Sequence, residues 1–158
     1  MTQYRVGTGF DAHALENGVP LVLGGLEFRS PRGLAGHSDG DVIAHALIDA
    51  LLGPVGLGDI GTLFPSDDAS LAGVSSLKLL ADAYASVREL GWKLVNADVV
   101  FIGNEPRIGP VRKEMERLLA SALEGDGTVT VRATTTDGLG FTGRGEGLAA
   151  QAVALLRQ

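Results

Sequence analysis

Runs of hydrophobic residues with β-strand character occur in four places along the chain. Two lie near the start, Gln3 to Gly9 and Pro20 to Phe28, and Gly24-Gly25 interrupts the second run, which favours a hairpin there. Strands are also predicted over Leu94 to Ile102 and over Thr128 to Thr135, where the residues alternate in character. Together these runs predict a mixed sheet.

Hydrophobic residues recur at helical spacing in four other segments. These run from the N-cap Asp41 to Gly53-Pro54, from Ser75 or Ser76 to Gly91, from Pro110 to Leu123, and from Gly147 to Leu156. The last segment is rich in alanine on more than one face, so we predict a buried helix there, suited to a contact between subunits. Residues 30–39 and 56–68 are predicted to be polar, glycine-containing loops. The elements predict an α/β fold of the α+β type: a single domain over residues 1–158, with a mixed β-sheet and helices packed on one side.

The composition supports this fold class and narrows the function. Of the 158 residues, 45% are hydrophobic and 20% are charged, which is ordinary for one soluble domain. The net charge of −6 excludes the basic surface that a nucleic acid requires, so an anionic substrate would need metal ions, backbone amides or a few arginines. Without cysteine, a transition-metal site depends on histidine and carboxylate ligands. We expect no membrane segment and no signal peptide, and therefore a cytoplasmic enzyme or binding protein.

The segment GFDAHAL, residues 9–15, contains the first candidate for chemistry. Asp11 and His13 are two residues apart, so on a strand both side chains point to one face, roughly 6.5–7 Å apart along the backbone. His37 and His45 are the other imidazoles, and His45 lies one turn into the predicted helix after Asp41. An Asp/His/His set with an open position suits tetrahedral Zn²⁺. The alternative is a turn-capping aspartate with surface or hydrogen-bonded core histidines, and spacing alone leaves both interpretations open.

Two short motifs suggest enzymes that the rest of the chain excludes. GHSDGD, residues 36–41, matches G-x-S-x-G, but the hydrolase motif needs a later histidine, and the last one, His45, follows within seven residues. We interpret it instead as a polar loop before a helix N-terminus whose free N–H groups favour an anion. GLGFTG, residues 138–143, matches G-x-G-x-x-G, but the chain ends before the acidic residue that dinucleotide sites need about 20 positions later. Two interpretations remain: a turn that serves packing only, or a phosphate-binding turn next to Thr134, Thr135, Thr136 and Arg144.

Polar loops supply further candidates. Asp59 and Asp67-Asp68 are loop carboxylates, which are most often solvated or turn-forming. GNEPRIGP, residues 103–110, directly follows a predicted strand, and loops that leave a strand for a helix commonly bind small ligands. Arg107 in that loop is either a ligand contact or a surface cation.

Several long motifs resemble the 2-C-methyl-D-erythritol 2,4-cyclodiphosphate synthase family of the non-mevalonate isoprenoid pathway. They are GFDAHAL at 9–15, LGG at 23–25, AGHSDGDVIAHALIDALLG at 35–53, GDIGTLFPSDD at 58–68 and RATTTDGLGFTGRGEGLAAQAVALL at 132–156. The matches run nearly end to end and in order, so they are far more specific than the short patterns. The resemblance implies conversion of 4-diphosphocytidyl-2-C-methyl-D-erythritol 2-phosphate to 2-C-methyl-D-erythritol 2,4-cyclodiphosphate and CMP, by metal-assisted attack of the 2-phosphate on the β-phosphate.

The resemblance also implies a homotrimer whose sheets face a central axis, with active sites between adjacent subunits. Each site is implied to bind Zn²⁺ and a second divalent cation, Mg²⁺ or Mn²⁺. The family's zinc ligands fall on Asp11, His13 and His45. The implied substrate contacts are Asp11, His13, His37, Ser38, Asp59, Ile60, Gly61, Phe64, Asp68, Gly103, Asn104, Glu105, Pro106, Arg107, Ile108, Gly109, Thr134, Thr135, Thr136, Asp137, Phe141 and Arg144.

Two of the implied roles are catalytic, and two positions depart from the family pattern. His37 and Thr135 take the catalytic positions. Asp137 stands where the family often has a glutamate ligand for the second ion, and its shorter arm reaches the ion directly or through water. Arg107 replaces a frequent lysine, which keeps the charge but changes the contact geometry.

Two other functions use the same residues. One is a non-catalytic trimer that binds an isoprenoid diphosphate in a central cavity, with Phe10, Arg144 and Glu146 as candidate contacts. The other is a metal-dependent phosphohydrolase that uses the Asp/His/His site and a water nucleophile. The loops at 103–110 and 133–138 match a nucleotide-holding site, which argues against the phosphohydrolase, whereas a ligand in the central cavity is compatible with catalysis.

Overall fold

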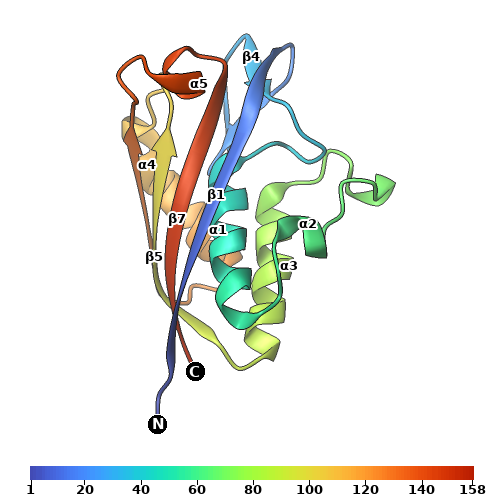
Figure 1. Ribbon diagram of the computed structural model, residues 1–158, viewed down its shortest axis with the longest axis vertical. Helices are drawn as coiled ribbons and strands as arrows, with labels where there is room; N and C mark the ends of the chain where they lie inside the picture. Colours follow the sequence, from blue (N-terminus) through green and yellow to red (C-terminus); the bar gives the residue numbers. More distant parts are fainter.

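The computed structural model describes residues 1–158 and contains one five-stranded sheet in the order β4-β1-β7-β5-β6 (Figure 1). The strands are β1 (Tyr4–Asn17), β4 (Arg32–Leu34), β5 (Lys93–Ile102), β6 (Thr128–Thr134) and β7 (Gly147–Arg157). Only the β5–β6 pair is parallel, while β7 is antiparallel to both β1 and β5, so the predicted mixed sheet is confirmed. A separate hairpin of β2 (Leu21–Leu23) and β3 (Leu26–Phe28) turns at Gly24-Gly25, as predicted.

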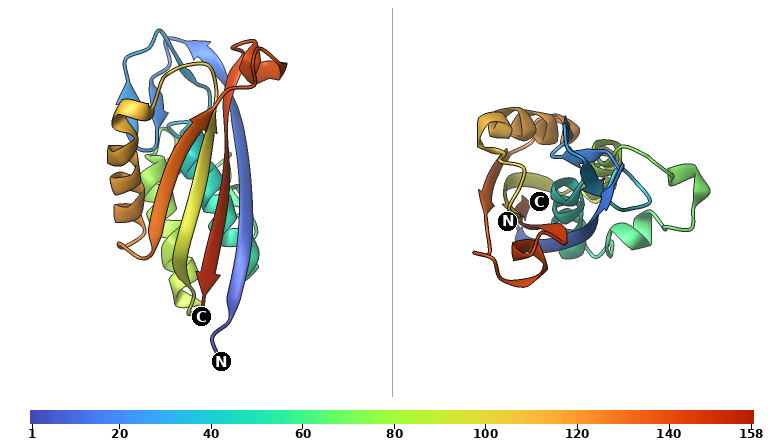
Figure 2. Two further views of the ribbon diagram at one scale, coloured as in Figure 1. Left: turned by 90° about the vertical axis from the view of Figure 1, so that its left-hand side faces the viewer. Right: turned by 90° about the horizontal axis from the view of Figure 1, so that it is seen from above.

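The helices α1 (Val42–Leu52), α3 (Ser76–Glu89) and α4 (Arg112–Ala122) cover one face of the sheet (Figure 2). Helix α1 packs on β1 and β7 and α4 packs on β6, while α3 contacts both helices. Short helices α2 (Ile60–Leu63) and α5 (Gly140–Gly143) and the 3₁₀ turns Gly53–Val55, Ala69–Leu71 and Gly109–Val111 complete the fold. The predicted loops 30–39 and 56–68 therefore also contain β4 and α2. None of the helices combines the length and apolar character that crossing a membrane requires.

The prediction of a helix over Gly147 to Leu156 is wrong, because this segment is β7, the central strand of the sheet. It pairs with β1 along one side and with β5 along the other. Ala150, Ala152 and Ala154 are fully buried beneath α1, whereas Gln151 and Val153 alternate with them on the open face. Alanine favours a helix in isolation. Pairing on both sides and burial of one face override that preference here.

Asp41 caps α1 as predicted and also fixes the neighbouring hairpin. Its buried carboxylate accepts hydrogen bonds from the N–H groups of Ile43, Ala44, Gly24 and Gly25 at 2.8–3.2 Å. Burial raises the pKa of Asp41 to about 6, although the N–H donors favour the charged form. The expectation that this N-terminus offers free N–H groups to an anion is wrong for two of these groups, because Asp41 already accepts the N–H groups of Ile43 and Ala44.

Two glycines set the distance between β1 and α1. A Cβ atom on Gly7 would lie 2.0 Å from the Ala50 carbonyl oxygen, and one on Gly9 would lie 1.9 Å from that of Ala46. The absence of side chains lets the strand lie directly against the helix backbone. Strand β1 also continues past Gly9 to Asn17, beyond its predicted end, so the next inward-facing positions of the same strand lie beside α1.

Candidate metal centre and substrate pocket

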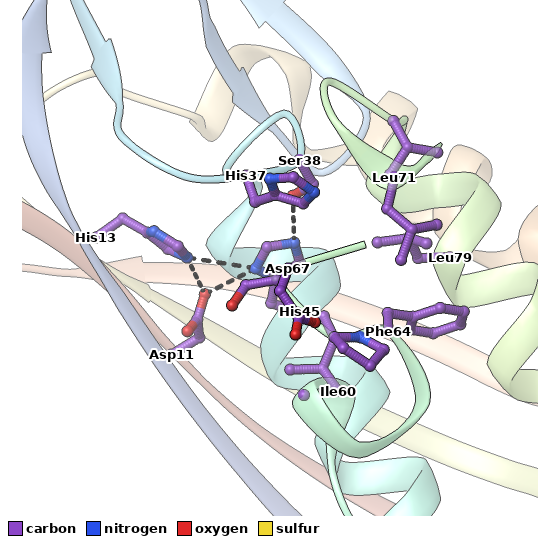
Figure 3. A pocket seen from close by; sticks show the side chains of 14 residues that line it. Asp11, His13, His37, Ser38, His45, Ile60, Phe64, Asp67, Leu71 and Leu79 are labelled. Carbon is purple, nitrogen blue, oxygen red and sulfur yellow. Dashed lines mark hydrogen bonds and ion pairs between the residues drawn. The ribbon is translucent and has the colours of Figure 1, made fainter. Parts of the chain in front are cut away.

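Asp11, His13 and His45 converge where β1 crosses α1 (Figure 3). Asp11 Oδ2 lies 2.9 Å from His13 Nε2 and 3.1 Å from His45 Nδ1, and the two imidazole nitrogens are 3.4 Å apart. His45 is buried, and Asp11 and His13 are partly open to solvent. The strand spacing and the helix position therefore bring together the trio that the sequence singled out.

The donor set fits one divalent metal ion. Zinc bonds of about 2.0–2.1 Å in a tetrahedral site put ligand atoms about 3.3 Å apart. The observed separations of 2.9–3.4 Å lie close to this value. Two imidazoles and one carboxylate leave the fourth position of such a site for a substrate oxygen. The three residues thus form a candidate metal-binding triad on the protein.

The surroundings shift the pKa values of Asp11 and His13 in opposite directions. Burial alone would raise the pKa of Asp11, but hydrogen bonds and charge from His13 and His45 hold that pKa below its ordinary value. The hydrogen bond to Asp11 raises the pKa of His13 against the opposing effect of burial. His13 Nδ1 lies 2.5 Å from the carbonyl oxygen of Ala35, which only accepts, so Nδ1 carries a proton and the Nε2 lone pair can face a metal.

A pocket of about 520 Å³ opens beside the triad. Its lining includes eight predicted site residues: Asp11, His13, His37, Ser38, His45, Ile60, Gly61 and Phe64. His37 and Ser38 come from the loop before α1 and lie above His45 in Figure 3. A single hollow therefore contains all eight of these residues, from β1, the loop before α1, α1 itself and the segment around α2.

Two predicted loop carboxylates have local structural partners and do not line the pocket. Asp59 caps α2 through the backbone and hydroxyl of Thr62, and these hydrogen bonds lower the pKa of Asp59. Asp68 accepts hydrogen bonds from Ser70, which lower its pKa in the same way. The backbone carbonyl of Asp68 lies 2.8 Å from His37 Nε2, so Asp68 orients a residue of the pocket.

Sequence reasoning missed a second group of residues at this site. These are Pro65, Ser66, Leu71, Val74 and Leu79, whereas Asp67, which also lines the pocket, was among the candidate loop carboxylates of the sequence. Ser76 is fully buried behind the pocket, with its Oγ 2.8 Å from His45 Nε2. In the sequence, a serine at the start of a helix signals a cap, and nothing in the local pattern indicates that its hydroxyl faces an imidazole.

The other predicted residues gather at a different edge of the sheet. The loop 103–109 follows β5, and Thr134 to Asp137 follows its parallel neighbour β6, with Gly103 N–H bonded to the Thr134 carbonyl at 3.1 Å. Asn104 donates to the Gly143 carbonyl at 3.0 Å, which ties this loop to α5, and Thr135 donates to Asp137 at 3.2 Å. Within one chain, none of the residues 103–109 or 134–137 lines the pocket of the triad.

Phe141 and Arg144 belong to this second region. Arg144 pairs with Glu146 at 2.8 Å. Phe141 and Glu146 line a smaller hollow of about 350 Å³ together with residues of β1.

The fold and the site define a class of protein: an α/β domain whose sheet and first helix hold a candidate metal-binding triad on the wall of a pocket of about 520 Å³. A family model described as the YgbB family matches residues 4–157, and the chain belongs to this family.

Named relatives agree with the family assignment. The chain is 47% identical over 153 residues to the 2-C-methyl-D-erythritol 2,4-cyclodiphosphate synthase of Clostridium acetobutylicum, covering 96% of this chain and 99% of the relative. A solved 2C-methyl-D-erythritol-2,4-cyclodiphosphate synthase in a CDP-bound form superposes with a TM-score of 0.85 at 40% identity, covering 96% of this chain and 99% of the other. The bifunctional IspDF of Campylobacter jejuni superposes with a TM-score of 0.93 at 39% identity. That match covers 99% of this chain and only 43% of the longer one.

Proposed function

We propose that this protein converts 4-diphosphocytidyl-2-C-methyl-D-erythritol 2-phosphate into 2-C-methyl-D-erythritol 2,4-cyclodiphosphate with release of CMP. The observation that carries the proposal is the Asp11/His13/His45 donor set on the wall of a 520 Å³ pocket in a chain of this family. The relatives that carry the synthase name match the chain over nearly its whole length, which supports residues 1–158 as a single synthase domain.

The proposed reaction explains the residue types at the site. One oxygen of the 2-phosphate forms a bond to the β-phosphorus, the bond from that phosphorus to the α-phosphate oxygen breaks, and CMP leaves with the electron pair. The nucleophile is already an anion, so the site needs no activated serine or strong base. A zinc ion on the triad would supply positive charge to the 2-phosphate. His37 and Ser38 line the same pocket and would orient that phosphate with their polar atoms.

We extend the proposal to a homotrimer with active sites between adjacent subunits. One support is the separation of the two groups of site residues, at β1 on one side of β7 and after β5 and β6 on the other. A second support is the open face of the sheet, where Val6, Phe10 and Val153 are 67%, 57% and 41% exposed. Sheets facing a central axis would bury these side chains and bring the second group of one subunit to the triad of the next.

In this arrangement the second group would complete the site. The loop Gly103 to Gly109, with Arg107, would hold the cytidine, and Thr135 would contact the phosphates in the catalytic position. Asp137 would bind the second divalent cation, Mg²⁺ or Mn²⁺, which joins Zn²⁺ as a cofactor. The hollow next to Phe141 and Glu146 supports a further proposal of an isoprenoid diphosphate on the central axis. A cytoplasmic location is part of the same proposal.

Phosphorus NMR of the purified protein with the cytidyl substrate and Mg²⁺ or Mn²⁺ tests the reaction. We expect signals of a cyclic diphosphate together with free CMP. Inorganic phosphate would identify a phosphohydrolase instead, and the absence of turnover would leave a binding protein. Because bond formation is intramolecular, both phosphorus atoms of the cyclic product should come from the substrate. A second phosphate compound added to the reaction should therefore leave the phosphorus signals of the product unchanged.

A further inference from the structure

His45 has two ring nitrogens, and only one of them faces the triad. Nδ1 lies next to Asp11 and His13, whereas Nε2 points into the protein, 2.8 Å from Ser76 Oγ and 3.0 Å from Ser38 Oγ. A neutral imidazole that binds a metal through Nδ1 must carry its proton on Nε2. A hydroxyl group can donate or accept, so the contact with serine by itself leaves the position of the proton undetermined.

Asp39 determines the direction of this hydrogen bond. Ser76 Oγ donates to Asp39 Oδ1, and the backbone N–H of Ser76 donates to Asp39 Oδ2 at 3.0 Å. A carboxylate only accepts hydrogen bonds, so the single hydroxyl proton of Ser76 is directed to Asp39. Ser76 therefore presents only lone pairs to His45, and the 2.8 Å contact is favourable only when Nε2 carries the proton.

Burial and anchoring make this arrangement rigid. Ser76 has no exposed surface and His45 is 6% exposed, so bulk water cannot replace the serine as a hydrogen-bond partner. Ser76 is the first residue of α3, and Asp39 also accepts the backbone N–H of Asp41 at 3.2 Å. The loop that carries Asp39 is thus tied to the starts of both α1 and α3.

The alternative tautomer would close the metal site. With its proton on Nδ1, His45 would donate to Asp11 Oδ2, 3.1 Å away, and no lone pair would face the ion. For His13 the Ala35 carbonyl already excludes the corresponding tautomer, because a carbonyl oxygen only accepts hydrogen bonds and therefore keeps a proton on Nδ1. His45 has no carbonyl in this position and depends on a hydroxyl whose direction a carboxylate sets.

We propose that Asp39 and Ser76 are a positioning pair that holds the His45 proton on Nε2 and so keeps Nδ1 available to the metal ion. This inference rests on the metal site of the proposed function and assigns a role to two residues outside the triad. Hydrogen-bond partners of metal-binding histidines typically change metal affinity by about 10–100-fold when they are removed.

Zinc affinity, measured by competition with a chelator, tests the pair. We expect Ser76→Ala and Asp39→Asn to raise the zinc dissociation constant by about 10–100-fold. Asp39→Asn is the sharper variant, because its amide group can donate to Ser76 and direct the serine proton toward His45 Nε2. Ser75→Ala is the matched control, since Ser75 adjoins Ser76 at the start of α3 and its side chain makes no capping hydrogen bond, so its zinc affinity should stay close to that of the wild type.

Nitrogen-15 NMR of the histidine rings provides a measurement that needs no metal. In the metal-free protein Asp11 and Ser76 compete for the His45 proton, so the comparison is between variants: we expect a larger share of protonated Nε2 in the wild type than in Ser76→Ala, where the proton shifts toward Nδ1. Thermal unfolding of each metal-free variant separates loss of the fold from loss of the tautomer. If Ser76→Ala does not fold, the same comparison between the wild type and Asp39→Asn decides.

Two results would overturn the inference. One is wild-type zinc affinity in folded Ser76→Ala and Asp39→Asn, and the other is an unchanged share of the Nε2-protonated tautomer of His45 in both folded variants. If the wild-type protein itself binds no zinc, the metal site fails and the positioning pair fails with it. If the wild type binds zinc and the variants bind it equally well, only the positioning pair fails.

Discussion

Gly9→Ala directly tests how the contact between β1 and α1 creates the metal centre. A Cβ atom at this position would lie 1.9 Å from the Ala46 carbonyl oxygen and 2.9 Å from the Ala50 nitrogen. Side-chain Cβ atoms essentially never approach other atoms more closely than 3.0 Å. The strand and the helix would have to separate by the difference, 3.0 − 1.9 = 1.1 Å, because the obstructing atoms are backbone and cannot rotate away.

This separation should affect both stability and metal binding. Overpacking of a closely packed core costs about 1–3 kcal/mol, occasionally more. For a chain of this length each kcal/mol lowers the melting temperature by about 2–4 °C, so we expect a decrease of about 2–12 °C. Metal–ligand distances tolerate changes of only about 0.2 Å. A shift of this size next to Asp11 would separate the β1 ligands from His45, and zinc affinity should fall as well.

Thermal unfolding and zinc competition on the same preparations measure the two effects. Gly61→Ala is the control, because a Cβ at Gly61 would meet only Asp59 Oδ1, at an ordinary contact distance of 3.5 Å, and the residue lies inside α2. That variant should unfold at or slightly above the wild-type temperature, since it restricts the unfolded chain. Wild-type stability and zinc affinity in Gly9→Ala would refute the argument that the missing side chain sets the strand–helix distance.

Three further changes test other parts of the molecule. Tyr84→Phe should cost about 1–3 kcal/mol of unfolding free energy in urea titrations, because the buried Leu94 N–H loses its acceptor at 2.9 Å and Asp126 loses one donor at 2.8 Å while keeping Arg88. Burial raises the pKa of Tyr84 from 10.0 to about 12, so as the pH rises through this interval the unfolded chain ionises first. Wild-type stability should then fall by up to about 1.4 kcal/mol per pH unit relative to the variant, and parallel pH profiles would contradict this assignment. His45→Ala should abolish zinc retention, measured as metal content after gel filtration, and unchanged content would remove His45 from the site. Asp137→Asn should lower activity when Mg²⁺ or Mn²⁺ is limiting, and wild-type metal dependence would exclude Asp137 as a ligand of the second ion.

Elements with strong local signals could be predicted from the sequence. Helix α1 has a cap at Asp41 and a stop at Gly53-Pro54, and the structure has the helix over Val42–Leu52 between them. Strand β7 has no such signal, because alanine and other small residues occupy both of its faces near the start and fit helical and strand periods equally well. Its true partners, β1 and β5, lie far away in the sequence, and pairing with them determines its conformation.

The site divides in the same way between local and non-local information. Asp11 and His13 could be paired from strand spacing alone, and His45 was one of only two remaining imidazoles. Ser76 could not be found, because its role depends on where the start of α3 meets the loop before α1, a contact between distant segments. The residues that touch the metal had chemical signatures, whereas the residue that orients one of them resembled an ordinary helix-starting serine.

The inward face of β1 carries two functions that cannot be separated. Every second residue from Gly7 to His13 points to this face. Gly7 and Gly9 let the strand approach α1, and Asp11 and His13 follow them and form the candidate metal site with His45 of α1. A metal ion held by the triad would therefore link the first strand to the first helix. Any ligand that binds only the folded state stabilises it, by about 4 kcal/mol at a thousand times its dissociation constant. Zinc should thus raise the unfolding temperature of the wild type and lose this effect in Gly9→Ala, because one close contact determines both the fold and the site.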